Sequence, residues 1–535
     1  MYHYRISELK LHIGEPVANL PRLIERRLRL PAGVIGSDRW EIRRESVDAR
    51  DKSDIRLVYT VDFTLDRPLA PQKLRGQKSI TLVDDKPREI PRPGTEPLTA
   101  RPVVVGFGPA GIFAALELAR LGYRPIVLER GASMEERVAD VTRFREEGVL
   151  DPESNVLFGE GGAGTFSDGK LTTGIKDGNI RYVLEVFARA GAGQEILYQH
   201  RPHIGTDVLR TVIVQIRREI EALGGTVLFH TKLEQLVTVD GRLAGIRIRN
   251  GQGDCVTMPA QALILATGHS ARDTFEMIHS QGLRMEPKPL SIGVRMEHPQ
   301  ELIDRAQYGE ERRLPPADYK LSYHASNGRG VYSFCMCPGG EVIVCSTAEG
   351  ELCVNGMSNR LRDSGTANSG ILCDVRTEDF GGEDVLAGVR FQQRYERLAF
   401  RLGQEQAAAN GNANRIFNPP RCTMREFLSG EGDGRYVHAS LPDFASEAIR
   451  EAVPAFARRI RGFDKDDAVV TAVETRSSSP VRIARDETGQ SNIRGIYPTG
   501  EGAGYAGRIT SAACDGIRAA YRIVARYAAQ SENSR

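Results

Sequence analysis

Residues 103–130 read VVVGFGPAGIFAALELARLGYRPIVLER, and this stretch decides the fold of the main part of the chain. The three valines are typical of a buried parallel strand, and the glycine-rich turn GFGPAG follows them directly. Gly106 permits a tight turn, Gly108 allows the backbone to approach a pyrophosphate, and Gly111 allows close packing of helix on strand. The stretch therefore predicts a dinucleotide-binding strand–helix–strand unit.

The residues after the turn fit the same unit. An apolar helix with several alanines is followed by a second short strand, 125–128, which ends at Glu129. Glu129 comes 18 residues after Gly111, where an acidic side chain can hydrogen-bond a ribose hydroxyl. The free N–H groups and the positive end of the helix would face the phosphates.

Composition excludes several classes of protein. The 535 residues allow two or three domains, and 40% hydrophobic with 27% charged residues is ordinary for a globular protein. A formal net charge of +2 does not by itself indicate a nucleic-acid partner. The first residues, MYHYRISELK, contain no apolar signal region, and no run of 18 apolar residues occurs. We expect a soluble cytoplasmic protein that does not bind membranes.

The chain divides into four segments. Short alternating strands and one helix fill the first 66 residues, and five prolines between Pro87 and Pro102 indicate an extended linker. From residue 287 the sequence pattern changes to short strands, glycines and polar loops. The last segment is again a strand, a glycine-rich loop and a helix. We predict an α/β protein with a discontinuous Rossmann-type domain: an N-terminal α/β appendage at 1–95, the first part of the dinucleotide domain at 96–286, an inserted mixed α+β substrate domain at 287–470, and the closing part at 471–535.

The closing segment favours flavin over nicotinamide. Gly500 and Glu501 follow a strand, and a helix beginning near Gly507 would direct its N-terminus at the ligand. An acidic side chain there can bond a ribityl hydroxyl, and the helix end can stabilise negative charge on a reduced flavin. Nicotinamide enzymes need no such additional contact, so FAD is the expected cofactor.

The chain resembles a family of uncharacterised bacterial FAD-dependent dehydrogenases, within the glutathione-reductase-like flavoproteins that have one Rossmann domain. The resemblance spans roughly residues 100–520. It is carried by GFGPAGIFAALELA, LFGEGGAGTFSDGKL, ILATGHSARDTF, SFCMCPGGEVI, VNGMSNRLRD, VETRSSSPVRI and PTGEGAGYAGRITSAACDGI. Arg508 stands where the family has a second glycine, which weakens the expectation for that loop.

The resemblance implies a set of FAD contacts. The first turn would hold the pyrophosphate, Glu129 the adenosine ribose, and the loop after ALIL the ribityl chain, with a further glycine-rich loop near the flavin ring. The implied cofactor-binding residues are Gly106, Gly108, Pro109, Ala110, Gly111, Glu129, Arg130, Gly162, Ala163, Gly164, Ala266, Thr267, Gly268, Gly500, Glu501 and Gly504.

Few residues are candidates for a catalytic role, because the flavin itself carries out the difficult chemical step. Asp168, Lys170 and Arg476 are the catalytic candidates, with Ser167 and Glu474 beside them. Asp168-Gly169 fits a simple turn equally well. Cys335 and Cys337 are read as an alternating strand with both side chains on one face rather than as a redox pair. No metal-binding pattern is present in the sequence.

The second substrate is left open. Only one glycine fingerprint occurs, so either NAD(P)H docks transiently at the flavin, or an organic substrate and oxygen are the two partners. Arg295 and Arg329 could bind a phosphate or carboxylate, or could form surface ion pairs.

We therefore expect an FAD-dependent oxidoreductase that transfers hydride between a small-molecule substrate and a non-covalently bound flavin. The alternative is a flavin-containing RNA-modification or assembly factor whose N-terminal unit binds nucleic acid. Its motivation is a group of basic residues, Arg26, Arg27, Arg29, Arg43 and Arg44. Residues 1–98 hold 19 Lys and Arg against 15 Asp and Glu, and this small excess argues against a strong phosphate-binding surface. The substrate and the oligomeric state cannot be inferred from the sequence.

Overall fold

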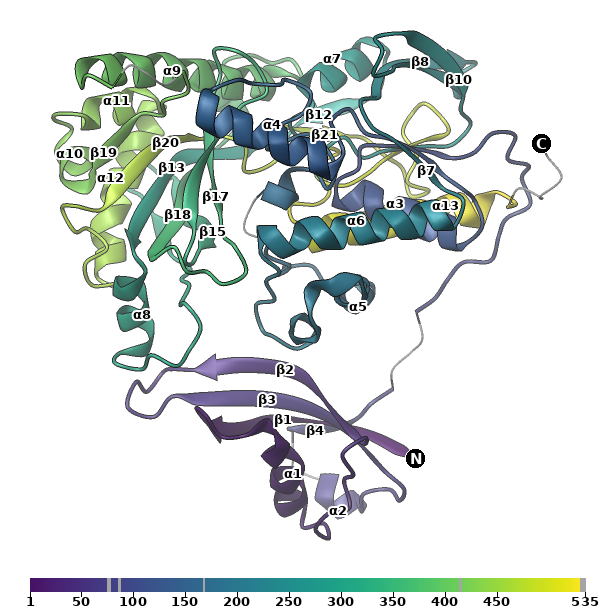
Figure 1. Ribbon diagram of the computed structural model, residues 1–535, viewed down its shortest axis with the longest axis vertical. Helices are drawn as coiled ribbons and strands as arrows, with labels where there is room; N and C mark the ends of the chain where they lie inside the picture. Colours follow the sequence, from purple (N-terminus) through teal and green to yellow (C-terminus); the bar gives the residue numbers. More distant parts are fainter. Residues whose placement is uncertain (75–77, 85–87, 167–168, 413–415, 530–535) are drawn as a thin grey trace.

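The computed structural model describes residues 1–74, 78–84, 88–166, 169–412 and 416–529 (Figure 1). The N-terminal unit is an antiparallel sheet of order β2-β3-β1-β4, with both of its α-helices on one face (Figure 1). This is the strand order of a split βαβ fold. Its elements are β1 (Tyr2–His12), η1 (Val17–Asn19), α1 (Leu20–Leu28), β2 (Trp40–Asp48), β3 (Arg56–Leu65), α2 (Pro71–Leu74) and β4 (Ile80–Leu82).

The proline-rich segment after this unit runs along the main body. The Gly94 N–H donates to the Val524 carbonyl at 2.8 Å, and Glu96 pairs with Arg526 at 2.9 Å. The Arg88 guanidinium lies 3.5 Å from the centre of the Tyr182 ring and pairs with the buried Glu117. These contacts attach the predicted linker to the last helix of the chain and, through Arg88, to two other helices of the main body.

A five-stranded parallel sheet forms the centre of the main body, in the order β22-β11-β5-β6-β7. The chain starts at β5, moves outward to β6 and β7, and returns to the other side of β5 for β11 and β22. This is the doubly wound order, in which the switch point lies between β5 and β11. The strands are β5 (Val103–Val105), β6 (Ile126–Leu128), β7 (Thr226–Leu228), β11 (Leu263–Leu265) and β22 (Ile496–Pro498).

Three helices from distant parts of the sequence pack together beside this sheet: α3 (Pro109–Arg120), α6 (Thr206–Ala222) and α13 (Ile509–Arg526) (Figure 1). Small residues let α3 and α13 approach closely, since a Cβ on Gly516 would lie 2.0 Å from the Ala110 carbonyl oxygen. The other helices and strands of this part are α4 (Met134–Glu147), α5 (Ile180–Phe187), β8 (Lys232–Val239), β9 (Arg242–Arg249), β10 (Cys255–Pro259) and α7 (Arg272–Ser280).

The insert is built on an antiparallel sheet of order β14-β15-β18-β13-β20-β19, with the hairpin β16–β17 beside it. The helices α9 to α12 pack on its outer side (Figure 1). Its elements are β13 (Leu290–Pro299), α8 (Gln300–Tyr308), β14 (Ser322–His324), β15 (Gly330–Cys337), β16 (Glu341–Cys345), β17 (Cys353–Met357), β18 (Thr366–Val375), α9 (Ala387–Ala409), β19 (Arg421–Thr423), α10 (Met424–Ser429), α11 (Gly434–Ala439), α12 (Asp443–Ala457) and β20 (Val469–Glu474).

The expected boundary at 470 cuts through β20. This strand pairs with β13 and β19 as far as Glu474, so the insert continues past the predicted end. A two-stranded pair, β12 (Met285–Pro287) with β21 (Val481–Ile483), then joins the entry and exit of the insert. Within the described ranges, no helix has both the length and the apolar character needed to cross a membrane.

The contact between α3 and α13 predicts the effect of Gly516→Ala. Alanine at an open helix position stabilises by about 1 kcal/mol relative to glycine. Here the new methyl group would overlap the Ala110 carbonyl, so we expect a net loss of about 1–3 kcal/mol. Thermal unfolding of this variant should be compared with that of Gly178→Ala, where no described atom lies within 4 Å of the added carbon. An unchanged or raised midpoint for Gly516→Ala would contradict the close packing.

Candidate active site

A cavity of about 500 Å³ lies at the switch point of the parallel sheet. One end is lined by the residues that follow β5 and β11, and the other by β15 and β17 of the insert. In α/β proteins, ligands bind outside the carboxyl ends of the strands at this point. Of the predicted site residues, the cavity is lined by Gly106, Gly108, Pro109, Ala110, Glu129, Arg130, Gly162, Ala163, Gly164, Lys170, Ala266, Thr267, Gly268, Arg476 and Glu501.

The three fingerprint glycines have different structural roles. Gly106 has φ +97°, and a Cβ there would lie 2.4 Å from the Ala266 carbonyl oxygen. A Cβ on Gly111 would lie 1.9 Å from the Gly106 carbonyl oxygen, so Gly111 serves helix packing and does not line the cavity. Gly108 has an ordinary φ of −82°, and a Cβ added there would have the Gly162 Cα, at 3.7 Å, as its nearest neighbour. Gly108 is therefore the fingerprint glycine whose α-carbon has open space in front of it.

Glu129 ties three loops together at the same end. Its carboxylate accepts hydrogen bonds from the backbone N–H groups of Phe107 at 2.8 Å, Gly131 at 2.9 Å and Gly159 at 3.0 Å. The side chain is buried but still lines the cavity. A carboxylate offers about four acceptor positions, so one remains for a ligand hydroxyl.

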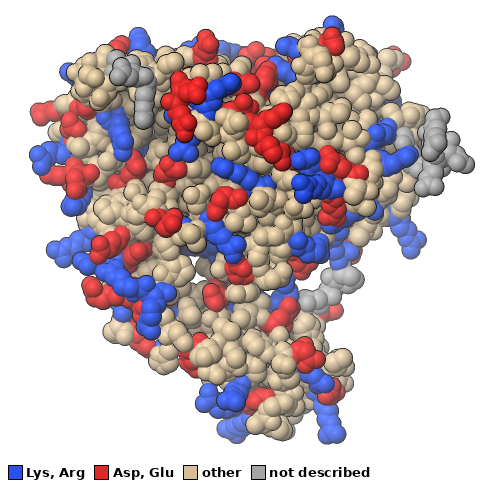
Figure 2. All heavy atoms as spheres, viewed as in Figure 1, with Lys and Arg blue, Asp and Glu red and all other residues tan. Residues whose placement is uncertain are grey.

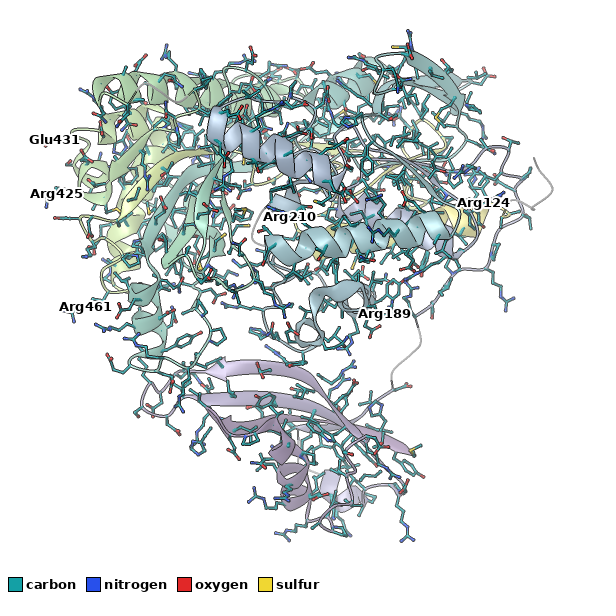
Figure 3. The ribbon with its side chains drawn as sticks, in the orientation of Figure 1. Arg124, Arg189, Arg210, Arg425, Glu431 and Arg461 are labelled. Atoms are coloured by element: carbon teal, nitrogen blue, oxygen red, sulfur yellow. The ribbon has the colours of Figure 1, made fainter. Side chains whose placement is uncertain are left out.

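A buried arginine, which the sequence analysis missed, shapes the second glycine-rich loop. Arg137 is fully buried and donates to the carbonyl oxygens of Asn155, Val156, Glu160 and Gly162 at 2.6–3.0 Å. Burial without a directly bonded carboxylate lowers the pKa of Arg137 to about 9. Its guanidinium and that of Arg210 (Figure 3) both lie within 5 Å of the centre of the Phe166 ring. The loop at 155–162 is thus held from within by one side chain.

The closing loop reaches the cavity through Glu501 and Gly507, whereas Gly500 and Gly504 support it from behind. The Gly500 N–H donates to Asp515 at 2.8 Å, and a Cβ on Gly500 would lie 2.7 Å from the Ala110 Cβ. Gly504 packs against β21, where its Cβ would lie 2.8 Å from the Val481 carbonyl oxygen. Gly500 and Gly504 do not line the cavity, so their predicted direct contact with the cofactor is replaced by a packing role.

The three catalytic candidates have different outcomes. Asp168, like Ser167, lies outside the described residues. Lys170 lines the cavity. Arg476 also lines it, but Nε and Nη2 bind Glu396 at 3.0 and 2.8 Å, and Nη1 binds Thr347. Arg476 therefore presents a neutralised ion pair to the cavity instead of an open anion-binding group.

Of the two interpretations of Arg295 and Arg329, the structure shows ion pairs and not an anion site, because neither side chain lines the cavity. Arg295 is fully buried and forms an ion pair with Glu474, with Nε 2.6 Å from Oε2. Arg329 pairs with Asp379 at 2.7 Å and lies over the Phe444 ring. Glu474 itself does line the cavity, and burial raises its pKa against the opposing effect of Arg295.

The expectation of a regular strand at Cys335 and Cys337 is also wrong. The register of β15 against β18 shifts between Phe334 and Cys337, and Cys335 has φ +40°. This bulge brings Cys335 to the cavity wall, while Cys337 is buried beneath it. Arg295 donates to the Cys335 carbonyl at 2.8 Å and so holds the bulge in place. β-Bulges commonly re-aim a side chain beside a functional site.

Comparison with known proteins identifies the family. Residues 289–477 match the family described as "FAD-dependent protein, C-terminal domain-like", and residues 3–64 match a domain of unknown function. A protein of Clostridium beijerinckii, named only as uncharacterized, is 44% identical over 533 residues, which is 98% of this chain and 99% of that protein. The chain belongs to the same family.

Two solved structures align over most of the chain. A geranylgeranyl bacteriochlorophyll reductase-like protein from Thermoplasma acidophilum is 14% identical, with 80% of this chain and 79% of that chain covered and a TM-score of 0.35. A flavin-dependent brominase is 13% identical, with 81% of each chain covered and a TM-score of 0.38. Neither score reaches 0.5. The narrower likeness to glutathione-reductase-like flavoproteins stays a prediction.

The residues around the cavity fit FAD. Gly108 and Gly162 face one another with no side chains between them, since a Cβ on Gly162 would lie 2.9 Å from the Gly108 Cα. This leaves exposed backbone of the kind that approaches a pyrophosphate closely. Further along the wall, His269 Nε2 and Ser270 Oγ are buried without a hydrogen-bond partner among the described residues. Buried polar atoms are normally satisfied, so these two atoms point to a polar ligand.

His269 and Ser270 directly follow ALILATG, and their place in the sequence could have identified them. Arg137 and Glu396 gave no such signal, because each acts through residues far away in the chain. Over the part of the chain that the structure describes, no group of three or more His, Cys, Asp and Glu side chains is arranged to hold a metal ion.

The Arg476–Glu396 pair predicts a pH effect on stability. Burial alone would raise the pKa of Glu396, but Arg272 and Arg476 outweigh it and hold this pKa well below its ordinary value. A depressed pKa contributes stability above the unfolded-state pKa, and this contribution is lost as the pH falls below it. Glu396→Gln removes the charge between two buried arginines, so we expect a loss of about 3–5 kcal/mol at pH 7.

The measurement is the thermal unfolding midpoint between pH 7 and pH 3. The wild-type midpoint should fall more steeply below about pH 4.3 than that of Glu396→Gln, which has lost this titrating group. Glu405→Gln on the same helix is the matched control, because Glu405 is exposed and lies 3.7 Å from its partner Arg401. Equal midpoints for Glu396→Gln and wild type at pH 7 would contradict the assigned role.

Proposed function

We propose that this protein is an FAD-dependent oxidoreductase acting on a small organic substrate. The observation that carries the proposal is one cavity lined by three loops from distant parts of the chain, at 106–110, 159–164 and 266–271, together with Glu501. When bound, FAD supplies a two-electron centre that exchanges hydride with an organic substrate. The family domain in the insert supports the choice of this cofactor.

The chain's own residues would hold the cofactor along the cavity. Gly108 caps α3, which begins with Pro109 and Ala110, and the free backbone N–H groups and positive end of this helix favour a pyrophosphate. Glu129 would accept a hydrogen bond from the adenosine ribose. His269, Ser270 and Glu501 would bind the middle of the cofactor, which is rich in hydroxyl groups.

The insert would shape the reacting end. Its strands β15 and β17 close the cavity opposite the cofactor loops and exclude water from one side. The first turn of α13, with Arg508 and Ile509, lines the same region, and the positive end of this helix stabilises negative charge nearby. Arg476 and Glu474 are fixed by their buried partners, so both would present rigid polar groups to a substrate.

The RNA alternative finds no supporting observation among the described residues. Arg43 pairs with Glu41 and Asp62, Arg27 bonds backbone oxygens of β1, and Arg44 bonds His200. Basic and acidic side chains are interspersed over the face shown in Figure 2, without an extended region of one sign. Phosphate-driven binding needs many uncompensated cations on one surface.

The proposal predicts a yellow protein. Full-length protein should show absorbance near about 450 nm, and denaturation should release this chromophore because no covalent attachment is expected. Spectra before and after denaturation and filtration test this directly. A protein that is colourless and takes up no FAD during reconstitution would refute the proposed function.

Gly108→Ala tests the placement of the cofactor. The added methyl group meets no described protein atom closer than 3.7 Å, so the fold should be retained, but it would enter the space reserved for the pyrophosphate. We expect FAD affinity to fall by about tenfold or more, equivalent to about 1.4 kcal/mol. Fluorescence titration with FAD measures it. Gly174→Ala, with no described atom within 4 Å of the added carbon, is the control. Equal affinities would show that FAD does not pass Gly108.

A further inference from the structure

The N-terminal unit touches the wall of the cavity at one defined point. β2, the edge strand nearest the main body (Figure 1), forms a parallel bridge between Glu45 and Gln199. The Glu45 N–H donates to the Tyr198 carbonyl at 2.7 Å, and the His200 N–H donates to the Glu45 carbonyl at 2.9 Å. His200 and the next residue, Arg201, both line the cavity. The segment 198–201 is thus held on one side by the N-terminal unit.

The same segment is held on its other side by the insert. Arg201 forms an ion pair with Asp318, and Asp318, Tyr319 and Lys320 also line the cavity. The residues 198–201 and 318–320 therefore form one rim, to which the N-terminal unit, the parallel-sheet domain and the insert all contribute. We refer to His200, Arg201, Asp318 and Lys320 as the entrance cluster.

Charge in the entrance cluster is mainly positive. Arg201 and Lys320 are exposed cations, and Arg201 forms an ion pair with Asp318, so two positive charges stand beside one carboxylate. Arg44 of β2 adds a third cation, since its Nη2 lies 2.8 Å from His200 Nδ1. A guanidinium can only donate, so Nδ1 accepts and the imidazole is neutral with its proton on Nε2. The cluster then offers hydrogen-bond donors and positive charge.

The pKa of the His200 imidazole responds to these positive charges. Partial burial, followed by the charges of Arg44 and Arg201, lowers the pKa of His200. An anion bound at the entrance would offset the two guanidinium charges and raise that pKa. His200 is therefore an internal reporter of what occupies the entrance.

Several charged side chains elsewhere along the cavity form ion pairs. Arg476 is neutralised by Glu396, Glu474 by Arg295, and Arg130 and Lys232 by Glu153 and Asp273. At the rim, where a substrate would arrive, the three cations Arg44, Arg201 and Lys320 are accompanied by the carboxylate of Asp318. A neutral or cationic molecule gains nothing from this arrangement, whereas an anion gains charge-assisted hydrogen bonds.

We propose that the entrance cluster binds the anionic group of the substrate, and that the N-terminal unit serves this site by holding 198–201 in place through β2. The inference rests on the proposed function, because it takes the anion to be part of the molecule that reacts in the cavity. The shared chemistry is a carboxylate or a phosphate on a small molecule. Arg201 and Lys320 contact the anion, and Arg44 and Glu45 are positioning residues.

The test is calorimetric titration of the full-length, FAD-loaded protein with benzoate, benzamide, inorganic phosphate and NADPH. Benzoate should bind at least tenfold more tightly than its neutral isostere benzamide. Tighter binding of phosphate or NADPH than of benzoate would support the anion site and assign the group as a phosphate. Equal binding of benzoate and benzamide, without binding of phosphate or NADPH, would overturn the proposal.

Variants locate the site. Lys320→Gln and Arg201→Gln should each weaken anion binding by about tenfold. Arg425→Gln should have no effect, because Arg425 is also an exposed arginine paired with one aspartate, Asp466, but lies on the outer side of the insert (Figure 3). Arg201→Gln breaks the ion pair with Asp318, whereas Lys320→Gln leaves that pair intact. Lys320→Gln therefore still tests the site if Arg201→Gln folds poorly. An unchanged affinity in Lys320→Gln would place the anion elsewhere.

A separate variant tests the role of the N-terminal unit. Glu45→Pro removes the N–H that bonds Tyr198, at an edge strand where proline is tolerated. It should weaken anion binding several-fold and leave FAD content unchanged. If Glu45→Pro binds the anion as tightly as the wild type, the N-terminal unit has no role in this site.

Two further readouts separate this inference from the proposed function. The imidazole pKa of His200, followed by NMR and assigned with His200→Asn, should rise when the bound anion is present. FAD content is recorded for every preparation. Anion binding by protein that takes up no FAD would leave the entrance site standing and refute the proposed function, whereas FAD uptake without any preference for anions would do the reverse.

Discussion

Direct contact between backbone segments, with no side chain between them, is the constraint on which the cofactor end of this molecule depends. The turn after β5 meets the turn after β11 at Gly106, α3 meets that first turn at Gly111, and α13 meets α3 at Gly516. Each contact would be blocked by a single methyl group. Together they bring the N-terminus of α3 and the loops after β5 and β11 to one place, and the cavity exists because those loops converge there.

Much of the remaining cavity wall is built on a different principle. Buried arginines satisfy carbonyl groups or carboxylates and fix the wall from behind: Arg137 under the loop at 155–162, Arg295 under the bulge of β15, and Arg272 with Arg476 around Glu396. A buried ion pair adds little net stability compared with apolar packing, but removal of one partner is costly. Such pairs therefore define the shape of the wall more than they stabilise the fold.

The sequence indicated the parts of this structure that depend on local pattern. The βαβ unit at 103–130, the strand at 263–265 and the closing helix all follow from apolar runs, glycine positions and turn chemistry. Long-range partners were not predictable in this way. Arg295 and Glu474 are 179 residues apart, so nothing near either one reveals the pair. The bulge at Cys335 is set by pairing with β18, and β20 was divided at 470 because its partner β13 lies far back in the chain.

The order of strands in the parallel sheet has a consequence for how the protein forms during synthesis. β22 pairs with β11, yet the whole insert is made between them. The ribosome therefore releases an incomplete sheet whose β11 edge stays unpaired until the insert has emerged. Unpaired strand edges invite aggregation, and late long-range pairing is slow. Early folding of the insert, which brings β12 and β21 together, would shorten the effective loop between β11 and β22 and so lower the entropic cost of closing the sheet.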